Sequence, residues 1–259
     1  MPLLNTRDIQ ETILELPNPE GDLLQWNHVL EPEFHQSIYV SACTRAAGVT
    51  GAFQLGEPKN LKAPPHRGTQ PKYADIEDDA DSLDYEGMVL SDGSILDSGG
   101  GKRNVCALKS ISVRWGFIDF GVARSVSRKF YTDKKTKSGV EENDLLINST
   151  GDGTIGRVAV YNRWFPAVVD GHITIVRFKD ADLAWYVAAY LLSEEGQNQL
   201  YRYINGSSGQ VEIYPQDIAR VWIPPKESQQ MKKIATKLRG ACKKHDEFFT
   251  DIKTALSML

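Results

Sequence analysis

Cysteine is scarce in this sequence: Cys43, Cys106 and Cys242 lie far apart and are odd in number. Their spacing supports neither a C-x-x-C zinc pair nor a disulfide framework, so we expect reduced, buried cysteines and no metal site. Long hydrophobic runs are also lacking, because no stretch approaches the roughly 18 consecutive apolar residues of a membrane span. The N-terminus lacks a basic region followed by an apolar core. We therefore expect a cytoplasmic protein without a membrane partner.

Motifs of catalysis are lacking as well. The sequence has no H-E-x-x-H, no G-x-S-x-G nucleophile elbow and no Asn/Asp-Pro-Pro-Tyr/Phe stretch like the catalytic loop of DNA amino-methyltransferases. Lys102 follows a run of glycines, but Leu96 and Arg103 occupy positions where a P-loop needs glycine and Ser or Thr. Acidic residues form no recognisable acid/base pair. We therefore expect no catalytic residue and no cofactor.

The charge distribution is uneven although the net charge is only −4. The stretch from Lys102 to Lys137 contains ten basic residues and two acidic ones, whereas the stretch from Asp75 to Glu86 contains seven acids and no base. A solvated surface with ion pairs would explain this segregation. A phosphate-binding face, with the acidic stretch kept away from it, would explain it equally.

The most informative stretch runs from Asp144 to Tyr161, where two apolar runs flank a glycine-rich turn. Gly151, Gly153 and Gly156 have the G-x-G-x-x-G spacing that places a dinucleotide phosphate at the start of a helix. Here the residues from Arg157 onward alternate β-branched residues with others, which is typical of a strand. We therefore predict a strand, a turn and a strand, with the glycines supplying positive φ to the turn.

Hydrophobic spacing predicts further elements on both sides of this stretch. Helical spacing marks residues 6–16, 32–47 and 181–204. Runs of β-branched and aromatic residues predict strands at 87–90, 105–113, 115–120, 173–178 and 221–225. Proline, glycine and basic residues at 59–73 predict an ordered loop, and loops on a rigid scaffold often carry recognition.

The last helix, predicted over 226–259, is the most regular element. Apolar residues recur on one seam by steps of three and four, the pattern of a coiled coil. His245 on this seam has no His or Cys at ligand spacing, so we expect a polar seam residue rather than a metal ligand. For oligomerisation we expect Met231, Ile234, Leu238, Phe248, Ile252 and Leu256 to contribute.

The stretch from Asp144 to about Leu238 resembles the target recognition domains in specificity subunits of type I restriction–modification systems. After the Thr-Gly and Thr-Ile-Gly-Arg-Val-Ala-Val signature, that family has a helix, a Gly-Ser loop, a short strand ending in Pro-Pro and a Gln that opens a long helix. This sequence has the loop at 205–210, the strand at 221–225 and the opening at 227–235, in that order. The 68–73 stretch is similar to the family's loop ahead of its variable region.

The resemblance implies a mixed β-sheet recognition domain of the α/β (α+β) class over 1–225, followed by a long C-terminal coiled-coil helix over 226–259. It also implies contact with DNA. Basic residues in loops suit phosphate contact, and Ser and Gln can reach a base edge or a phosphate. The candidates for DNA binding are Arg67, Lys72, Lys102, Arg103, Arg124, Arg128, Lys129, Lys134, Lys135, Arg157, Ser207, Ser208 and Gln210. Lys102 and Arg103 would lie in a flexible loop, and 124–137 would also suit a plain surface hairpin.

The function implied is that of a sequence-specific specificity subunit, which directs methyltransferase and restriction subunits to a bipartite site on double-stranded DNA and leaves catalysis to them. Full-length family members resemble two such halves in tandem. This chain has one, so we expect a homodimer or pairing with another half-subunit. Two alternatives stay open. One is a protein-binding adaptor that uses the C-terminal helix, and the other is a nuclease-associated recognition module of another defence system.

Overall fold

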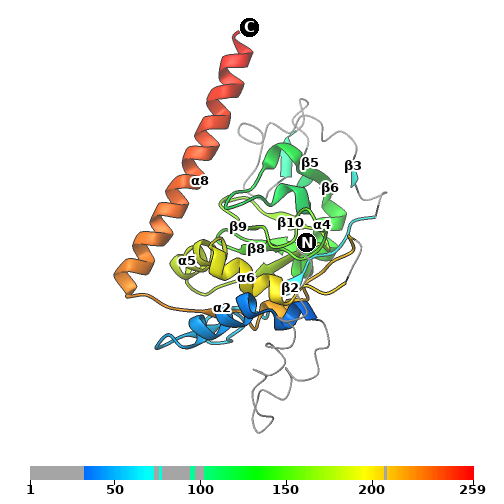
Figure 1. Cartoon of the computed structure of the whole chain (residues 1–259). Helices are drawn as coiled ribbons and strands as arrows, with labels where there is room; N and C mark the ends of the chain where they lie inside the picture. The colour runs from blue at the N-terminus through cyan, green and yellow to red at the C-terminus, as the bar shows by residue number, and fades with distance from the viewer. Residues whose placement is uncertain (1–31, 73–75, 78–93, 97–101, 207–208) are drawn as a thin grey trace.

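A computed structural model describes residues 32–72, 76–77, 94–96, 102–206 and 209–259 (Figure 1). The α-helices are α2 (Ser37–Ala47), α4 (Arg128–Ser138), α5 (Ala181–Leu191), α6 (Glu194–Arg202), α7 (Pro215–Ile218) and α8 (Ser228–Ser257), with 3-10 turns η2 (Pro32–His35), η5 (Ser110–Ser112) and η6 (Phe120–Val122). The strands are β1 (Phe53–Gln54), β2 (His66–Arg67), β3 (Ile76–Glu77), β4 (Ser94–Leu96), β5 (Lys102–Leu108), β6 (Arg124–Ser127), β7 (Gly139–Val140), β8 (Leu145–Asn148), β9 (Val158–Val160), β10 (Ala167–Val169), β11 (Ile173–Val176) and β12 (Trp222–Ile223). The predicted α/β class with a long C-terminal helix is confirmed.

The described strands form three sheets. One sheet has the order β3-β6-β5-β10-β7, with β4 also paired to β5, and a second has the order β2-β11-β8-β9. Strands β1 and β12 form a separate pair. The pairing of β10 with β5 is parallel, and the other pairs are antiparallel. The short turn between β10 and β11 joins the two larger sheets.

The predicted hairpin at the centre of the chain is confirmed as β8 and β9. Leu145 lies opposite Val160, and Ile147 lies opposite Val158. Both faces of this hairpin are buried, because its residues alternate between two hydrophobic cores. The first core receives Leu145, Ile147, Val158, Val160 and Val176, and the second receives Leu146, Ala159, Tyr161, Ile173 and Ile175.

Several predicted boundaries differ from the structure. The helix expected over 181–204 is two helices, because Ser193 caps α6 by accepting a hydrogen bond from the Gly196 amide. The strand expected over 115–120 is a turn with positive φ at Gly116 and a single bridge between Val113 and Ile118. The helix expected over 32–47 is a 3-10 turn and α2. The elements expected at 6–16 and 87–90 lie outside the described residues.

The basic stretch 124–137 is also different from a surface hairpin. It forms strand β6 followed directly by α4. The hydroxyl of Ser127 accepts a hydrogen bond from the Phe130 amide at 3.1 Å, which caps the helix. Phe130 is buried in a small cluster with Val105, Val126 and Val168. This aromatic anchor turns the basic side chains of α4 outward.

The first part of helix α8 packs on the core of its own domain. Met231, Ile234 and Leu238 pack against the first core, and Ala235 is fully buried there. This packing corrects the expectation that the whole seam is available to a partner. The helix continues beyond the body of the molecule to the C-terminus (Figure 1). Among the described helices, none is long and apolar enough to cross a membrane.

Further contacts fix the middle of α8. The Cys242 thiol donates to the Gly116 carbonyl at 2.9 Å, and the His245 ring lies on the Phe117 ring with centroids 3.7 Å apart. Asp246 accepts hydrogen bonds from Arg163 at 2.8 Å and from Asn162 at 3.1 Å. His245 is therefore a packing residue of this contact. All the cysteines are free and buried, as predicted.

The glycines of the hairpin turn provide the first prediction. Gly151 and Gly156 have φ of 86° and 81°, whereas Gly153 has no positive φ and a Cβ there would meet no atom within 4 Å. The expectation that Gly153 is structural is therefore wrong. We predict that Gly156→Ala lowers the free energy of unfolding by about 1–2 kcal/mol, because a left-handed residue gains a Cβ 3.0 Å from the Gln197 Oε1. Urea unfolding measures this difference. Gly153→Ala is the control, and an equal loss in both variants would contradict the assignment.

Candidate nucleic-acid interface

One segment, residues 66–72, contains the candidate DNA-binding residues Arg67 and Lys72, and we call it the strap. Its first residues form β2, which pairs with β11 through Arg67 opposite Thr174. The Gly68 amide then donates to the Ile173 carbonyl at 3.1 Å. A Cβ at Gly68 would overlap the carbonyl oxygens of Val169 and Asp170. The strap therefore lies against the β10–β11 turn at a distance that only glycine permits.

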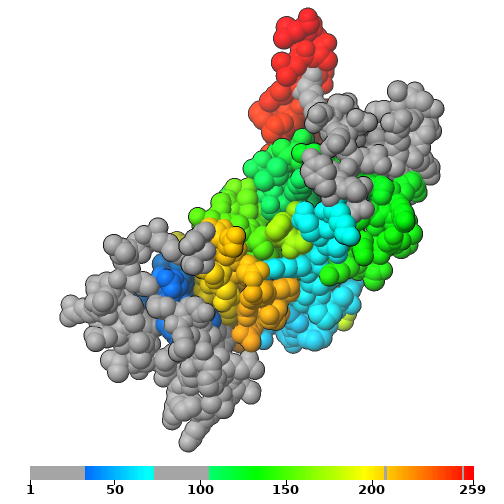
Figure 2. All heavy atoms as spheres, turned by 90° about the vertical axis from the view of Figure 1, so that its right-hand side faces the viewer, coloured from blue at the N-terminus to red at the C-terminus, as the bar shows by residue number. Residues whose placement is uncertain are grey.

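A groove of about 390 Å³ lies between the strap and α4. In Figure 2 the cyan strap and the green α4 are neighbours on the exposed face. The lining residues are Thr69, Gln70 and Lys72 of the strap with Ser127, Lys129, Phe130, Asp133 and Lys134. Three of the predicted DNA-binding residues, Lys72, Lys129 and Lys134, are thus brought to one place. Thr69, Gln70 and Asp133 were not predicted, because only the fold reveals that they share a groove with lysines.

The electrostatics of α4 favour an anion beside it. Arg128, Lys129, Lys134, Lys135 and Lys137 are exposed on this helix, and Asp133 is its one acidic residue. No acid occupies the first turn, where Arg128 and Lys129 add to the positive end of the helix dipole. These like charges repel one another and the helix terminus, and a phosphate group placed nearby would relieve that repulsion.

Lys102 and Arg103 begin β5, which corrects the expectation of a flexible loop there. Asn104 pairs with Ser127, so the beginning of β5 lies at the end of the sheet where α4 starts. The backbone therefore brings this dipeptide to the same end as the basic helix. Arg124 pairs opposite Ala107, at the far end of β6, and is exposed there. It is not part of the groove.

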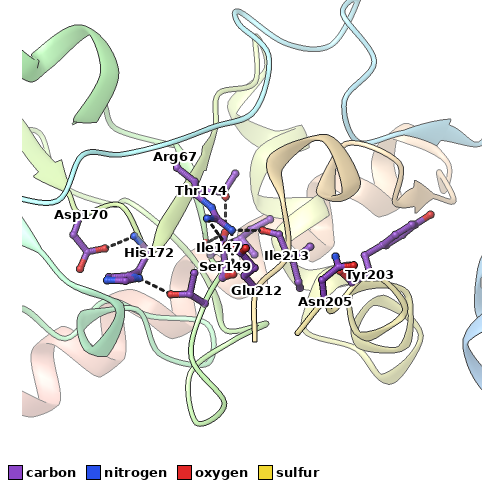
Figure 3. A network of polar contacts seen from close by, with 11 residues as sticks. Arg67, Ile147, Ser149, Asp170, His172, Thr174, Tyr203, Asn205, Glu212 and Ile213 are labelled. Carbon is purple, nitrogen blue, oxygen red and sulfur yellow. Dashed lines mark hydrogen bonds and ion pairs between the residues drawn. The ribbon is translucent and has the colours of Figure 1, made fainter. Parts of the chain in front are cut away.

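Arg67 has a different environment from the groove lysines (Figure 3). Its Nη1 donates to Glu212 Oε2 at 2.9 Å, and its Nη2 donates to the Ile213 carbonyl at 2.8 Å and more weakly to the Ser149 carbonyl at 3.5 Å. The guanidinium also lies 5.4 Å from the centroid of the Tyr214 ring. The guanidinium of Arg67 therefore bonds to other parts of the protein and is largely shielded from solvent.

The loop at 205–212 is held by backbone pairing on both sides. Asn205 and Glu212 exchange hydrogen bonds at 2.8 and 2.9 Å, and Gly206 has a φ of 96° that suits the turn between them. The Gly151 amide donates to the Val211 carbonyl at 3.0 Å, which ties the loop to the hairpin turn. Gln210 is exposed on this loop. Ser207 and Ser208 lie outside the described residues.

Side chains at the edge of the second sheet extend this polar network, and no motif in the sequence predicts them. Ser149 and Thr174 share a buried hydrogen bond of 2.5 Å, and Thr150 Oγ1 lies 2.6 Å from His172 Nδ1. Asp170 accepts from the His172 amide at 2.9 Å, and burial raises the pKa of this carboxyl. Because Asp170 contacts the backbone of His172 and not its ring, these residues do not form a catalytic triad.

Arg157 also has an internal partner, since its Nη2 donates to the Gly153 carbonyl at 2.7 Å across the hairpin turn. The candidates therefore divide into groups: the groove lysines with α4, the loop that carries Gln210, and Arg67 and Arg157, which hold loops in place. In the described part of the chain, no group of three or more His, Cys, Asp or Glu side chains could hold a metal ion.

The ion pair of Arg67 predicts a pH dependence of stability. The pKa of Glu212 lies below its usual value because the Tyr214 hydroxyl and then the Arg67 guanidinium donate to its carboxylate. A lowered pKa contributes stability above the pKa of an unfolded Glu, ~4.3, and that stability is lost as the pH falls through the folded value. We predict that Glu212→Gln loses less stability than the wild type between about pH 5 and pH 3. Urea unfolding at several pH values measures this, and parallel curves for the two proteins would contradict it.

No protein-family profile and no curated protein matches this sequence. Solved structures do match. The type IIG restriction endonuclease BpuSI matches with a TM-score of 0.52 and 11% identity, over 90% of this chain and 33% of that chain. A structure of complex assembly and conformational transition in the type I restriction–modification system matches with a TM-score of 0.46 and 11% identity, over 98% and 53% of the two chains.

The HsdS subunit from Thermoanaerobacter tengcongensis matches with a TM-score of 0.43 and 14% identity, over 93% of this chain and 52% of that chain. This chain thus spans about half the length of two of these proteins and a third of the other. Restriction–modification proteins are among its structural neighbours, in agreement with the resemblance found in the sequence. At such identities the likeness concerns the fold, and in fold this chain is similar to part of a restriction–modification protein.

Proposed function

We propose that this chain is a sequence-specific DNA-binding specificity subunit of a type I-like restriction–modification system. The basic groove between the strap and α4 carries the proposal. It combines the lysines at 72, 129 and 134 with a rigidly anchored helix and with polar side chains, Thr69 and Gln70, that suit contact with DNA. The fold of a restriction–modification protein supports the same function.

The proposed division of labour leaves catalysis to partner subunits. The DNA-recognition domain, residues 1–225, would bind one half of a bipartite site, and methyltransferase and restriction subunits would act on the DNA in the cytoplasm. The rival reading is an endonuclease-like module, which the similarity to BpuSI favours. Incubation of the chain alone with magnesium and plasmid DNA separates the two, because only the rival predicts cleavage.

The proposed arm, residues 226–259, extends this assembly. Beyond the contacts at Cys242 and Asp246, Phe248, Ile252 and Leu256 remain 58%, 40% and 63% exposed. They are spaced by four residues and lie on one stripe of α8. An exposed apolar stripe of this kind marks a protein interaction site. A second copy, another half-subunit or a methyltransferase subunit would cover it, and a two-fold pair would recreate a bipartite reader.

The salt dependence of DNA binding tests the groove. We predict that Lys129→Gln and Lys134→Gln each weaken binding to any duplex and reduce the slope of log affinity against log salt by about 0.9, because each removes one phosphate contact. Filter binding of a random duplex at a series of salt concentrations measures the slope. Lys237→Gln on α8 is the matched control, since Lys237 is an exposed helical lysine outside the groove.

Equal slopes in the groove variants and the control would remove this groove from the interface. If the wild-type chain shows no affinity for duplex DNA at low salt, the adaptor alternative replaces the proposed function, because an adaptor would bind only through α8.

The exposed stripe formed by Phe248, Ile252 and Leu256, which we call the distal stripe, is tested by measuring assembly. We predict that Phe248→Asp with Ile252→Asp abolishes assembly and methylation in a host carrying the system, while the domain stays folded and binds DNA weakly, because charges are placed where a partner must exclude water. Light scattering and methylome sequencing measure the two effects. Thr254→Asp is the control, because Thr254 is exposed on the opposite side of α8. Unchanged mass and an unchanged methylated site in the double variant would contradict the arm's proposed role.

A further inference from the structure

Arg67 is poorly suited to contact a phosphate directly. Its side chain is only 22% exposed, and its counter-charge Glu212 lies 2.9 Å away. The paired charges cancel, so they offer little attraction to an anion, and a phosphate would first have to displace the carboxylate. Its Nη2 is directed at the carbonyls of Ile213 and Ser149, and its Nε is buried with no hydrogen-bond partner among the described residues.

The contacts of Arg67 instead join three segments of the chain. We call Arg67, Glu212 and the carbonyls of Ser149 and Ile213 the Arg67 clamp. On one side, the strap continues through Gly68 to Lys72 in the groove. On the other side, Glu212 closes the loop that carries Gln210, two residues before it. Ser149 lies at the end of the β8–β9 hairpin, so the clamp fastens both segments to the buried sheet.

The guanidinium group of Arg67 is well suited to joining three segments. A guanidinium is planar and fixes the directions of several hydrogen bonds at once, which a lysine cannot do. The Tyr214 ring lies over the guanidinium and its hydroxyl donates to Glu212, so the pair is restrained from a further side. Arg67 thereby links the strap directly to the loop, in addition to the backbone hydrogen bonds that attach each of them to the neighbouring strands.

We infer that Arg67 is a positioning residue for sequence discrimination, which holds the Gln210 loop in register with the basic groove. This inference rests on the proposed DNA-binding function. Phosphate contacts in the groove fix the protein on any duplex, whereas base contacts discriminate only when they are placed accurately relative to the backbone. Loss of the clamp therefore lowers discrimination and leaves the number of phosphate contacts unchanged.

The test uses a pair of substitutions that conserves charge. In the full chain, Arg67→Gln with Glu212→Gln removes the clamp, and the pair stays neutral as in the wild type. Selection from a random duplex pool defines the sequence that the wild type prefers. The discrimination is then the ratio of affinities for that duplex and a scrambled one. We expect this ratio to fall roughly tenfold, the value of one base contact, with an unchanged salt slope.

A matched control is the pair Arg114→Gln with Asp119→Asn. Arg114 and Asp119 form an ion pair of similar exposure, 34% and 31%, at 3.2 Å, and they contact neither the strap nor the loop. This control should leave both the ratio and the slope unchanged. If the clamp variant does not fold, Tyr214→Leu loosens the same clamp and should lower the ratio in the same direction with a smaller effect.

Two results would overturn the inference. A salt slope reduced by about 0.9 in the clamp variant would make Arg67 a direct phosphate contact. An unchanged ratio and slope in a folded variant would make the clamp a stability element only. Failure of the proposed function itself is distinguishable, because then the wild-type chain would enrich no sequence from the pool.

Discussion

Burial of both faces of the sheet centred on β8 and β11 is the constraint on which the rest of the structure depends. Alternating side chains of these strands enter two separate cores, so neither face is available to a ligand. Arg177 reinforces the start of the hairpin by donating to both carboxylate oxygens of Asp144 at 2.8 and 2.7 Å. A ligand would therefore have to bind at the ends and edges of the sheet, where the strap and residues 209–212 lie.

Burial of both faces of this sheet also explains how short polar loops can be held in a defined position. The strap has few apolar residues of its own, and its order comes from β2 pairing, the close approach at Gly68 and the contacts of Arg67. Each of these attaches it to strands that cannot move without opening a core. Helix α4 is comparable, because a helix this rich in like charges gains little from its own sequence. The burial of Phe130 stabilises it.

The sequence predicted those parts of the fold that depend on local patterns. The β8–β9 hairpin, β11, β12 and α8 follow from period-two or helical spacing and from turn glycines, and they are confirmed. Helix α4 was missed, since its pattern is mostly charge and its single anchor, Phe130, becomes informative only when Val105 and Val168 are placed around it. The break at Ser193 was missed because apolar residues of both helices enter the first core, so the helical spacing continues across the break.

The candidate site was predictable in composition and not in arrangement. Charge segregation located the basic helix, but the pairing of Arg67 with Glu212 spans 145 positions and leaves no trace in local sequence. Arg67 and Lys72 look alike in the sequence, as basic residues of one loop. The fold separates them. Arg67 lies in β2 and points toward the protein, whereas Lys72 lies at the end of the strap and lines the groove.

Helix α8 is a second case in which the sequence predicts the element but not what packs against it. A seam of apolar residues predicts that something covers it, and the periodicity is identical whether the cover is the same chain or another. The structure divides the seam: Leu238 packs against the first core, whereas Phe248 and Ile252 are exposed. Because Asp246 and His245 fix the helix at the point of division, the distal stripe is held in a defined direction. A partner that covers it would therefore be placed at a fixed orientation to the strap and the groove.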